Sequence, residues 1–506
     1  MPSRSMTPLP GLFKPSPTRW EPRAIQKRGM RFLLEHHPGA GLLFDPGLGK
    51  TSCTLGAIKV LKKKGLRPKA LVIAPIRVMA GVWPDEIAKW LDFQDLSYVV
   101  LHGPKKEQLL QQDVDLYLIN PEGLDWLFNV TKVKEATGKK AIAVDLKRVR
   151  QCGFNLLVVD ELTKFKNHAS DRFKAMKQVL PLFPRRWGLT GTPAARYLEP
   201  LFGQVYVLDQ GAALGRYITH YRAQFFDQGF DGFTYTAKDG AEEQIYARLA
   251  NVALRADAKD HLDLPELVET QVVVDLPESA RAVYHELEND LLALVGKKLI
   301  TAKNSAVAAM KCRQVTAGAI YLEPGLGALG LPKGRTGREW VELHTAKLDA
   351  AEDLLEELQG SPAIVAYEFQ HDYERLQARL GGKRPLPHIG RGVGLAEGKR
   401  VQDAWNAGDV PVLLAHAGSI SHGLNLQHAG NHVLWYTLTW DYELYDQLIR
   451  RLLRQGSKHQ RVFSHALVAR GTIDEHVWAS IAAKKDCQNR LFEALKRLQG
   501  TRSKKS

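Results

Sequence analysis

Short apolar runs recur in the first half of the chain and alternate with longer amphipathic stretches. The runs lie at residues 41–45, 70–75, 115–120, 156–160 and 186–192. Runs that are apolar on both faces are typical of parallel strands covered by helices on each side of the sheet. Stretches such as TSCTLGAIKVLKKKG, which ends at Gly65, lie between them and predict helices. Strands that alternate with helices indicate a doubly wound α/β sheet.

The same alternation returns toward the C-terminus. Apolar runs lie at residues 363–367, 410–418, 431–436 and 461–468. A helix is predicted before the first of them, with Thr345 as its N-cap and Gly360 as its stop. The chain therefore predicts two α/β lobes. Residues 275–320 between them are rich in Ala, Leu, Glu and Lys and predict helices, and the Gly/Pro-rich residues 323–337 predict a loop.

These patterns divide the chain into five parts. We expect a flexible Pro/Ser-rich lead at 1–17, a first α/β lobe at 18–265, a helical insertion and linker at 266–345, a second lobe at 346–490 and a basic tail at 491–506. A chain of 506 residues is long enough for several domains with separate cores.

Composition narrows the class of protein. The net charge of +15, from 70 basic and 55 acidic residues, favours a polyanionic partner, most often nucleic acid, with general solubility as the alternative. The four cysteines stand far apart, which argues against a zinc site or a disulfide framework. No apolar run approaches the ~18 residues of a membrane span, and residues 1–17 lack the apolar core of a signal sequence, so we expect a cytoplasmic protein.

The segment LLFDPGLGKTS, residues 42–52, suggests a phosphate-binding loop that departs from G-x-x-x-x-G-K-[ST], because Phe44 stands at the first glycine position. Its glycines let backbone N–H groups approach phosphate oxygens at a helix N-terminus. Lys50 is expected to reach the β- and γ-phosphates, and the Thr51 hydroxyl to ligate magnesium. A plain strand-to-helix turn is the alternative. The residues expected around the nucleotide are Gly47, Leu48, Gly49, Lys50, Thr51 and Ser52.

Two further strand ends carry candidate chemistry. LLVVDELTKFKN places Asp160 and Glu161 at the carboxyl end of a strand, where open α/β sheets bind ligands. Asp160 is expected to hold magnesium, and Glu161 to orient and activate the attacking water. A charged helix start is the alternative. In LTGTP, the hydroxyls of Thr190 and Thr192 flank Gly191 and can report the γ-phosphate to the neighbouring lobe, although an ordinary turn explains this segment equally well.

Polar residues outside these loops complete the candidate site. Gln26 can read an adenine edge, with Trp20 or Arg23 nearby to stack on the base; a surface helix start is the alternative. Gln447, Arg451 and Arg454 are spaced by four and then three residues, which predicts one helical face. Arginines projected from a second lobe onto a γ-phosphate would act as arginine fingers. A solvated basic face or a phosphate-backbone contact is the alternative.

Taken in order, these segments resemble the motif series of helicase superfamily two, and most closely its Snf-type (Swi/Snf-related) ATPases in a short, bacterial or phage-like form. The segments are GLGKT, VIAPIRVMAGVWPDEIAKW, LINPEGL, VVDELTKFKN, LTGTP, GLNLQHAG and QLIRRLLRQGS, and the resemblance covers about residues 18–480. It implies two RecA-like lobes with ATP and Mg²⁺ in the cleft between them, with Gly423 and Asn425 contributing to the ATP site. It also implies hydrolysis driven by DNA and movement along the duplex.

One departure from this family bears on the coupling of the lobes. The family often has histidine two residues after the acidic pair, where this chain has Thr163, and we expect a looser link to the second lobe. An RNA-dependent ATPase or helicase and the motor subunit of a nuclease complex remain the alternative functions. We expect a monomer that binds duplex DNA largely without regard to sequence and does not associate with membranes.

Overall fold

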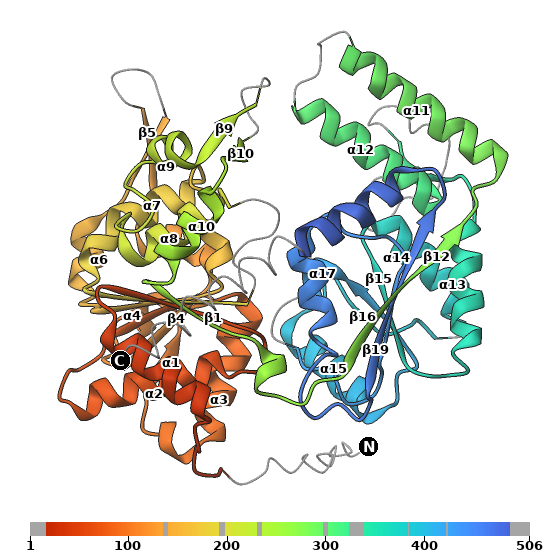
Figure 1. Ribbon diagram of the computed structural model, residues 1–506. Coiled ribbons are helices and arrows are strands. Elements are labelled where there is room, and N and C mark those ends of the chain that lie inside the picture. Colours follow the sequence, from red (N-terminus) through yellow and green to blue (C-terminus); the bar gives the residue numbers. More distant parts are fainter. Residues whose placement is uncertain are drawn as a thin grey trace, which may run out of the picture.

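The computed structural model describes residues 17–134, 140–191, 198–229, 235–296, 302–322, 339–382, 384–420 and 424–485. It contains two α/β lobes that stand side by side (Figure 1). The loop expected at 323–337, the tail expected at 491–506 and all but the last residue of the expected lead lie outside the described residues. Within the described residues, every helix is too short or too polar to cross a membrane.

The first lobe is built on a seven-stranded parallel sheet. Its strands, in spatial order, are β11 (Ala253–Ala256), β1 (Gly39–Phe44), β8 (Arg185–Thr190), β7 (Leu156–Asp160), β2 (Ala70–Ile73), β4 (Leu116–Ile119) and β3 (Tyr98–Val100). Successive residues of β1 enter different cores: Leu42 and Phe44 pack on one face and Leu43 on the other. The sheet is therefore covered on both faces, as the unbroken apolar runs predict.

Helices fill both sides of this sheet. The core that holds Phe44 also receives α1 (Ala24–Glu35), α2 (Lys50–Lys63) and α3 (Trp83–Lys89). The opposite core receives α4 (Lys106–Leu110), α5 (Leu124–Leu127), α6 (Leu146–Gln151), α7 (Asp171–Val179), α8 (Leu201–Asp209), α9 (Ile218–Phe225) and α10 (Ala241–Leu249). Two hairpins extend from this side, β5 (Thr131–Lys134) with β6 (Lys140–Ala143), and β9 (Phe226–Gln228) with β10 (Tyr235–Ala237) (Figure 1).

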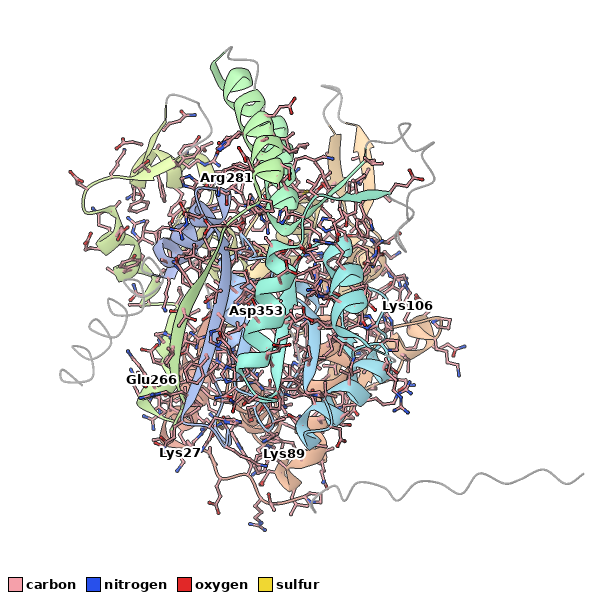
Figure 2. All side chains as sticks on the ribbon, turned by 90° about the vertical axis from the view of Figure 1, so that its right-hand side faces the viewer. Lys27, Lys89, Lys106, Glu266, Arg281 and Asp353 are labelled. Carbon is pink, nitrogen blue, oxygen red and sulfur yellow. The ribbon has the colours of Figure 1, made fainter. Side chains whose placement is uncertain are left out.

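The second lobe is built on a six-stranded parallel sheet. Its strands, in spatial order, are β12 (Glu266–Val274), β19 (Arg461–Ala469), β18 (His432–Trp435), β15 (Ala363–Tyr367), β17 (Val412–His416) and β16 (His388–Ile389). Its helices are α13 (Ala346–Glu357), α14 (Gln370–Leu380), α15 (Leu395–Ala407), α16 (Ala417–Ile420) and α17 (Tyr442–Ile449). Figure 2 looks onto this lobe, with α13 and its Asp353 in front of the sheet.

The segment 266–345 differs from the helical insertion and linker that the sequence predicts. It opens with β12, which pairs with β19 along its full length, so residues 266–274 belong to the second sheet. Figure 2 shows this strand rising from Glu266 toward Arg281. The helices α11 (Glu278–Gly296) and α12 (Ala302–Ala317) follow and project beyond the sheet, and β13 (Ala319–Tyr321) pairs with β14 (Trp340–Glu342) (Figure 1). Thr345 precedes α13, but its hydroxyl bonds the Asp349 carboxylate at 2.8 Å instead of capping the backbone.

Candidate active site

A cavity of about 580 Å³ lies between the lobes, and it gathers most of the residues that the sequence singles out. Those that line it are Arg23, Gln26, Gly47, Gly49, Lys50, Thr51, Ser52, Asp160, Glu161, Gly191, Asn425, Gln447, Arg451 and Arg454. Leu48 and Thr190 are fully buried beside it. Thr192 and Gly423 lie outside the described residues. In Figure 1, α17 stands on the side of the second lobe that faces the first.

The phosphate-loop candidate connects the end of β1 to the start of α2. Gly47 and Gly49 have φ values of +89° and +77°, in the left-handed region that favours glycine. A Cβ atom on Gly49 would also lie 2.3 Å from the Gln26 amide nitrogen. Phe44 is the last residue of β1 and is fully buried. Phe44 therefore closes the core beneath the loop, and the tight turn begins after it.

Lys50 is the first residue of α2 and lies among three carboxylates. Its Nζ donates a hydrogen bond of 2.7 Å to the Phe44 carbonyl oxygen. Burial lowers the Lys50 pKa to about 8, although Asp160, Glu161 and Asp45 oppose this shift. An anionic ligand in the cavity would favour the charged form of this lysine.

Helix α1 braces the loop from the side. Arg23 Nη2 donates to the Gly47 carbonyl at 3.0 Å, and Gln26 Nε2 donates to the Leu48 carbonyl at 3.2 Å. The other amide atom of Gln26 accepts from the Arg23 backbone N–H at 2.9 Å. Trp20 also lines the cavity. The guanidinium of Arg23 is thus bound to the loop, which leaves the Trp20 ring as the better placed of the two expected stacking groups.

The acidic pair lies at the end of β7. Asp160 Oδ2 accepts a hydrogen bond of 2.8 Å from the Trp83 indole Nε1. Burial raises the Asp160 pKa, while Trp83 and Lys50 act in the opposite direction. Glu161 has φ +93°, and its Oε1 accepts from the Thr190 hydroxyl at 2.7 Å. The last residue of β8 therefore fixes the orientation of the second carboxylate.

The oxygen groups at this end of the cavity fit a magnesium ion that arrives with a nucleotide. The Thr51 hydroxyl and the Asp160 carboxylate line the same cavity, and both are the hard donors that Mg²⁺ prefers. In the described part of the chain, no group of three or more His, Cys, Asp or Glu side chains could hold a metal ion. Mg²⁺ in phosphate-transfer sites is commonly held by one or two protein groups together with substrate phosphates, and this donor set matches that pattern.

The two arginines come from the segment that follows α17. The helix ends at Ile449, so the prediction that Gln447, Arg451 and Arg454 share one helical face is wrong; turns carry both arginines, and all three side chains still line the cavity. Arg451 donates to the carbonyls of Gln447 and Leu424, both at 3.2 Å. Arg454 bonds the Asn425 side chain. Burial lowers the pKa of Arg451, and that of Arg454 to about 10.

A buried ion-pair cluster that is not predicted from the sequence joins the lobes next to the phosphate loop. Asp45 contacts Arg255 Nη2 at 2.8 Å and, across the lobe boundary, Arg450 Nη1 at 3.3 Å. Arg450 also contacts Asp446 at 2.7 Å. Burial alone would raise the Asp45 pKa, but Arg450 and Arg255 outweigh it and hold the pKa at about 2. The one available signal was a set of arginines in an apolar segment, which require anionic partners.

Thr163 forms a direct link between the lobes, which corrects the expectation of a looser one. Its Oγ1 lies 3.0 Å from Glu161 Oε1 and 2.6 Å from Glu443 Oε1 on α17. Glu443 also receives hydrogen bonds from Lys166 at 3.1 Å and from Gln447 at 3.2 Å. Burial, and then the charge of Glu161, raises the Glu443 pKa. A protonated Glu443 can donate to Thr163, whose own proton then serves Glu161.

Known proteins resemble this chain along most of its length. The family model described as the SNF2-related domain matches residues 25–321. The putative protein p41 of Acyrthosiphon pisum secondary endosymbiont phage 1 is 32% identical over 468 residues, which cover 89% of this chain and 94% of that protein. The putative ATP-dependent helicase/translocase YwqA of Bacillus subtilis is 23% identical over 93% of this chain, and the match spans about half, 49%, of that relative. The SWI2/SNF2 ATPase core of Sulfolobus solfataricus, solved in complex with dsDNA, is 21% identical, with 94% of each chain covered and a TM-score of 0.42.

Proposed function

This chain belongs to the SNF2-related family, and we propose that it is an ATP-driven motor that moves along duplex DNA. The observation that carries the proposal is the composition of the cavity. Lys50, Asp160 and Glu161 come from the first lobe, whereas Arg451 and Arg454 come from the second. A site divided in this way is complete only when the lobes are correctly placed, so hydrolysis is tied to their movement.

Each group has a defined task in hydrolysis. Lys50 and the backbone N–H groups after Gly47 would bind the phosphates, and Thr51 and Asp160 would hold Mg²⁺, which would neutralise charge on the phosphate oxygens. Glu161, oriented by Thr190, positions the attacking water and accepts its proton. Arg451 and Arg454 stabilise the negative charge that develops on the transferred phosphoryl group.

The choice of DNA as the track rests on charge and on relatives. The net charge of +15 favours a polyanion, and a relative is named as an ATP-dependent helicase/translocase. We propose contacts to the phosphate backbone that are largely independent of sequence and therefore weaken as salt rises. We further propose that the protein acts as a monomer in the cytoplasm of a bacterium or an infected host cell, a place supported by the phage relative.

The deciding experiment is the ATPase rate without nucleic acid and with duplex DNA, single-stranded DNA or RNA. We expect strong stimulation by duplex DNA, and none in a Lys50→Ala variant. Equal rates with and without nucleic acid would contradict the motor function. Stimulation by RNA alone would show that the track is RNA and not DNA. Triplex displacement measured beside forked-duplex unwinding then separates translocation from strand separation.

A further inference from the structure

One face of α3 contacts two parts of the phosphate end of the cavity, the carboxylate at the end of β7 and the start of α2. Trp83, Glu86 and Trp90 are spaced by three and four residues, which places them on one side of the helix and its last turn. Trp83 bonds Asp160, and Glu86 accepts hydrogen bonds from the Ser52 hydroxyl of α2 and from Trp90 Nε1. The proposed hydrolysis mechanism uses none of these three residues.

The contact with Asp160 fixes a carboxylate that the mechanism needs. Trp83 is fully buried, and its indole nitrogen can only donate. A buried donor without a partner carries a desolvation penalty, so the indole favours the carboxylate orientation that satisfies it. Because Oδ2 accepts this bond, the other oxygen, Oδ1, is the one left for a ligand in the cavity.

The same segment reaches the second lobe at its other end. Arg77 lies just after β2, and its Nη2 donates to the Val393 carbonyl at 3.3 Å. It also packs on the start of α15, where a Cβ atom on Gly398 would come within 2.4 Å of Arg77 Nη1. Between Arg77 and Trp83 the backbone forms a five-residue π-helix, η1 (Val78–Val82), which leads directly into α3. Single π-helical turns are rare and occur frequently at functional sites.

We propose that residues 77–90 form a coupling arm between the second lobe and the magnesium–nucleotide site. In this arm Trp83 and Glu86 are positioning residues that orient Asp160 and Ser52. Arg77 ties the position of α3 to the second lobe, so the arrangement of the lobes sets how tightly Mg²⁺ and nucleotide are bound. This inference rests on the proposed ATPase function and adds the residues that regulate its metal site.

The first test measures binding of a fluorescent ATP analogue while MgCl₂ is titrated. We expect Trp83→Phe to raise the Mg²⁺ concentration at half-saturation by about tenfold, because it removes a hydrogen bond to a charged carboxylate. Trp187→Phe is the matched control, since Trp187 is buried in the same core and is not a hydrogen-bond partner of Asp160 among the described residues. Thermal melting checks that both variants fold.

The outcomes separate this inference from the function on which it rests. Equal Mg²⁺ requirements in Trp83→Phe and Trp187→Phe, beside a clear requirement in the wild type, would overturn the positioning role alone. Binding by the wild type that does not depend on Mg²⁺ would overturn the proposed metal site together with the arm.

The second test asks whether Arg77 acts through Trp83. We expect Arg77→Ala to raise the half-saturating Mg²⁺ concentration by about two- to fivefold in the wild type and to add little in Trp83→Phe, since residues in one network are not additive. Arg400→Ala is the control, because Arg400 lies exposed on α15 and, among the described residues, forms its ion pair with Glu397 one turn away. Additive effects of the two substitutions would contradict a coupling arm.

Discussion

The two lobes present their groups to the cavity in different ways. In the first lobe, Lys50, Gln26 and Glu161 are held by hydrogen bonds to neighbours within that lobe. In the second lobe, Arg451 and Arg454 lie in turns beyond the end of α17, and that helix is held against the first lobe by polar contacts. The first lobe thus supplies the groups that bind the nucleotide, and the second supplies arginines that reach the phosphate end of the cavity only when the lobes are correctly placed. Binding and hydrolysis should therefore respond separately to mutation.

The largest expected effect is on hydrolysis through the second lobe. Arg451→Ala or Arg454→Ala should lower kcat by roughly 10³–10⁵-fold, the range for arginine fingers, while ATP affinity changes far less. Single-turnover hydrolysis and equilibrium binding measure the two quantities. Arg461→Ala is the control, because Arg461 is mostly exposed and pairs with Glu266 at the start of β19. A loss of affinity as large as the loss of rate would erase the difference between the lobes.

The next largest effect is on the buried ion-pair cluster that joins the two lobes. Asp45→Asn leaves Arg450 and Arg255 without a shared carboxylate and should lower the free energy of unfolding by about 3 kcal/mol at neutral pH. Because the folded pKa of about 2 lies below the ordinary value, this contribution is full above about pH 4 and shrinks as the pH falls toward 2. Urea unfolding at several pH values measures it. Asp275→Asn, at an exposed pair with Arg470, should cost less than about 1 kcal/mol; equal costs would contradict the cluster.

Substitution of Lys50 in the first lobe should lower ATP affinity as well as hydrolysis, unlike substitution of the arginines. Lys50→Ala should weaken ATP binding by about 10- to 100-fold, since it removes a charge-assisted contact to phosphate, and abolish stimulated hydrolysis. Equilibrium binding of ATP measures the affinity. Lys59→Ala, on the same helix but paired with Asp95, should leave that affinity unchanged. Unchanged affinity in Lys50→Ala would show that the loop is not the phosphate site.

The smallest effect concerns the link through Thr163. Thr163→Val should lower DNA-stimulated kcat a few-fold, as expected for a hydrogen bond of about 1 kcal/mol. At low pH, Glu443→Gln should lower kcat less than Thr163→Val does, since a neutral amide resembles the protonated acid. The raised Glu443 pKa means that its contribution is full below the ordinary Glu pKa and is lost as pH rises through the folded value. As the pH rises, the rate should therefore fall more steeply in the wild type than in Glu443→Gln. Parallel profiles would contradict the link.

Local chemistry made much of this architecture predictable. Strands buried on both faces appear as apolar runs. A turn that needs positive φ favours glycine, so Gly47 and Gly49 indicate the phosphate loop. Edge strand β12 escaped prediction because polar residues such as Glu269 and Gln271 interrupt its pattern. Contacts such as Thr163–Glu443 join residues 280 positions apart, and neither residue type signals its partner. Sequence motifs therefore predict the groups that line the cavity, whereas the partners of these groups in the other lobe can be identified only from the folded structure.

The path of the chain between the lobes has a mechanical consequence. It leaves the first sheet at β11, which ends at Ala256, and enters the second at β12, which begins at Glu266; each is the outermost strand of its sheet. Because the connecting segment joins two edge strands, one lobe can rotate relative to the other without breaking any strand pairing inside either sheet. Along the described chain this is the single passage from one sheet to the other. The angle between the lobes is therefore set by the ion pairs and hydrogen bonds that join them beside the cavity.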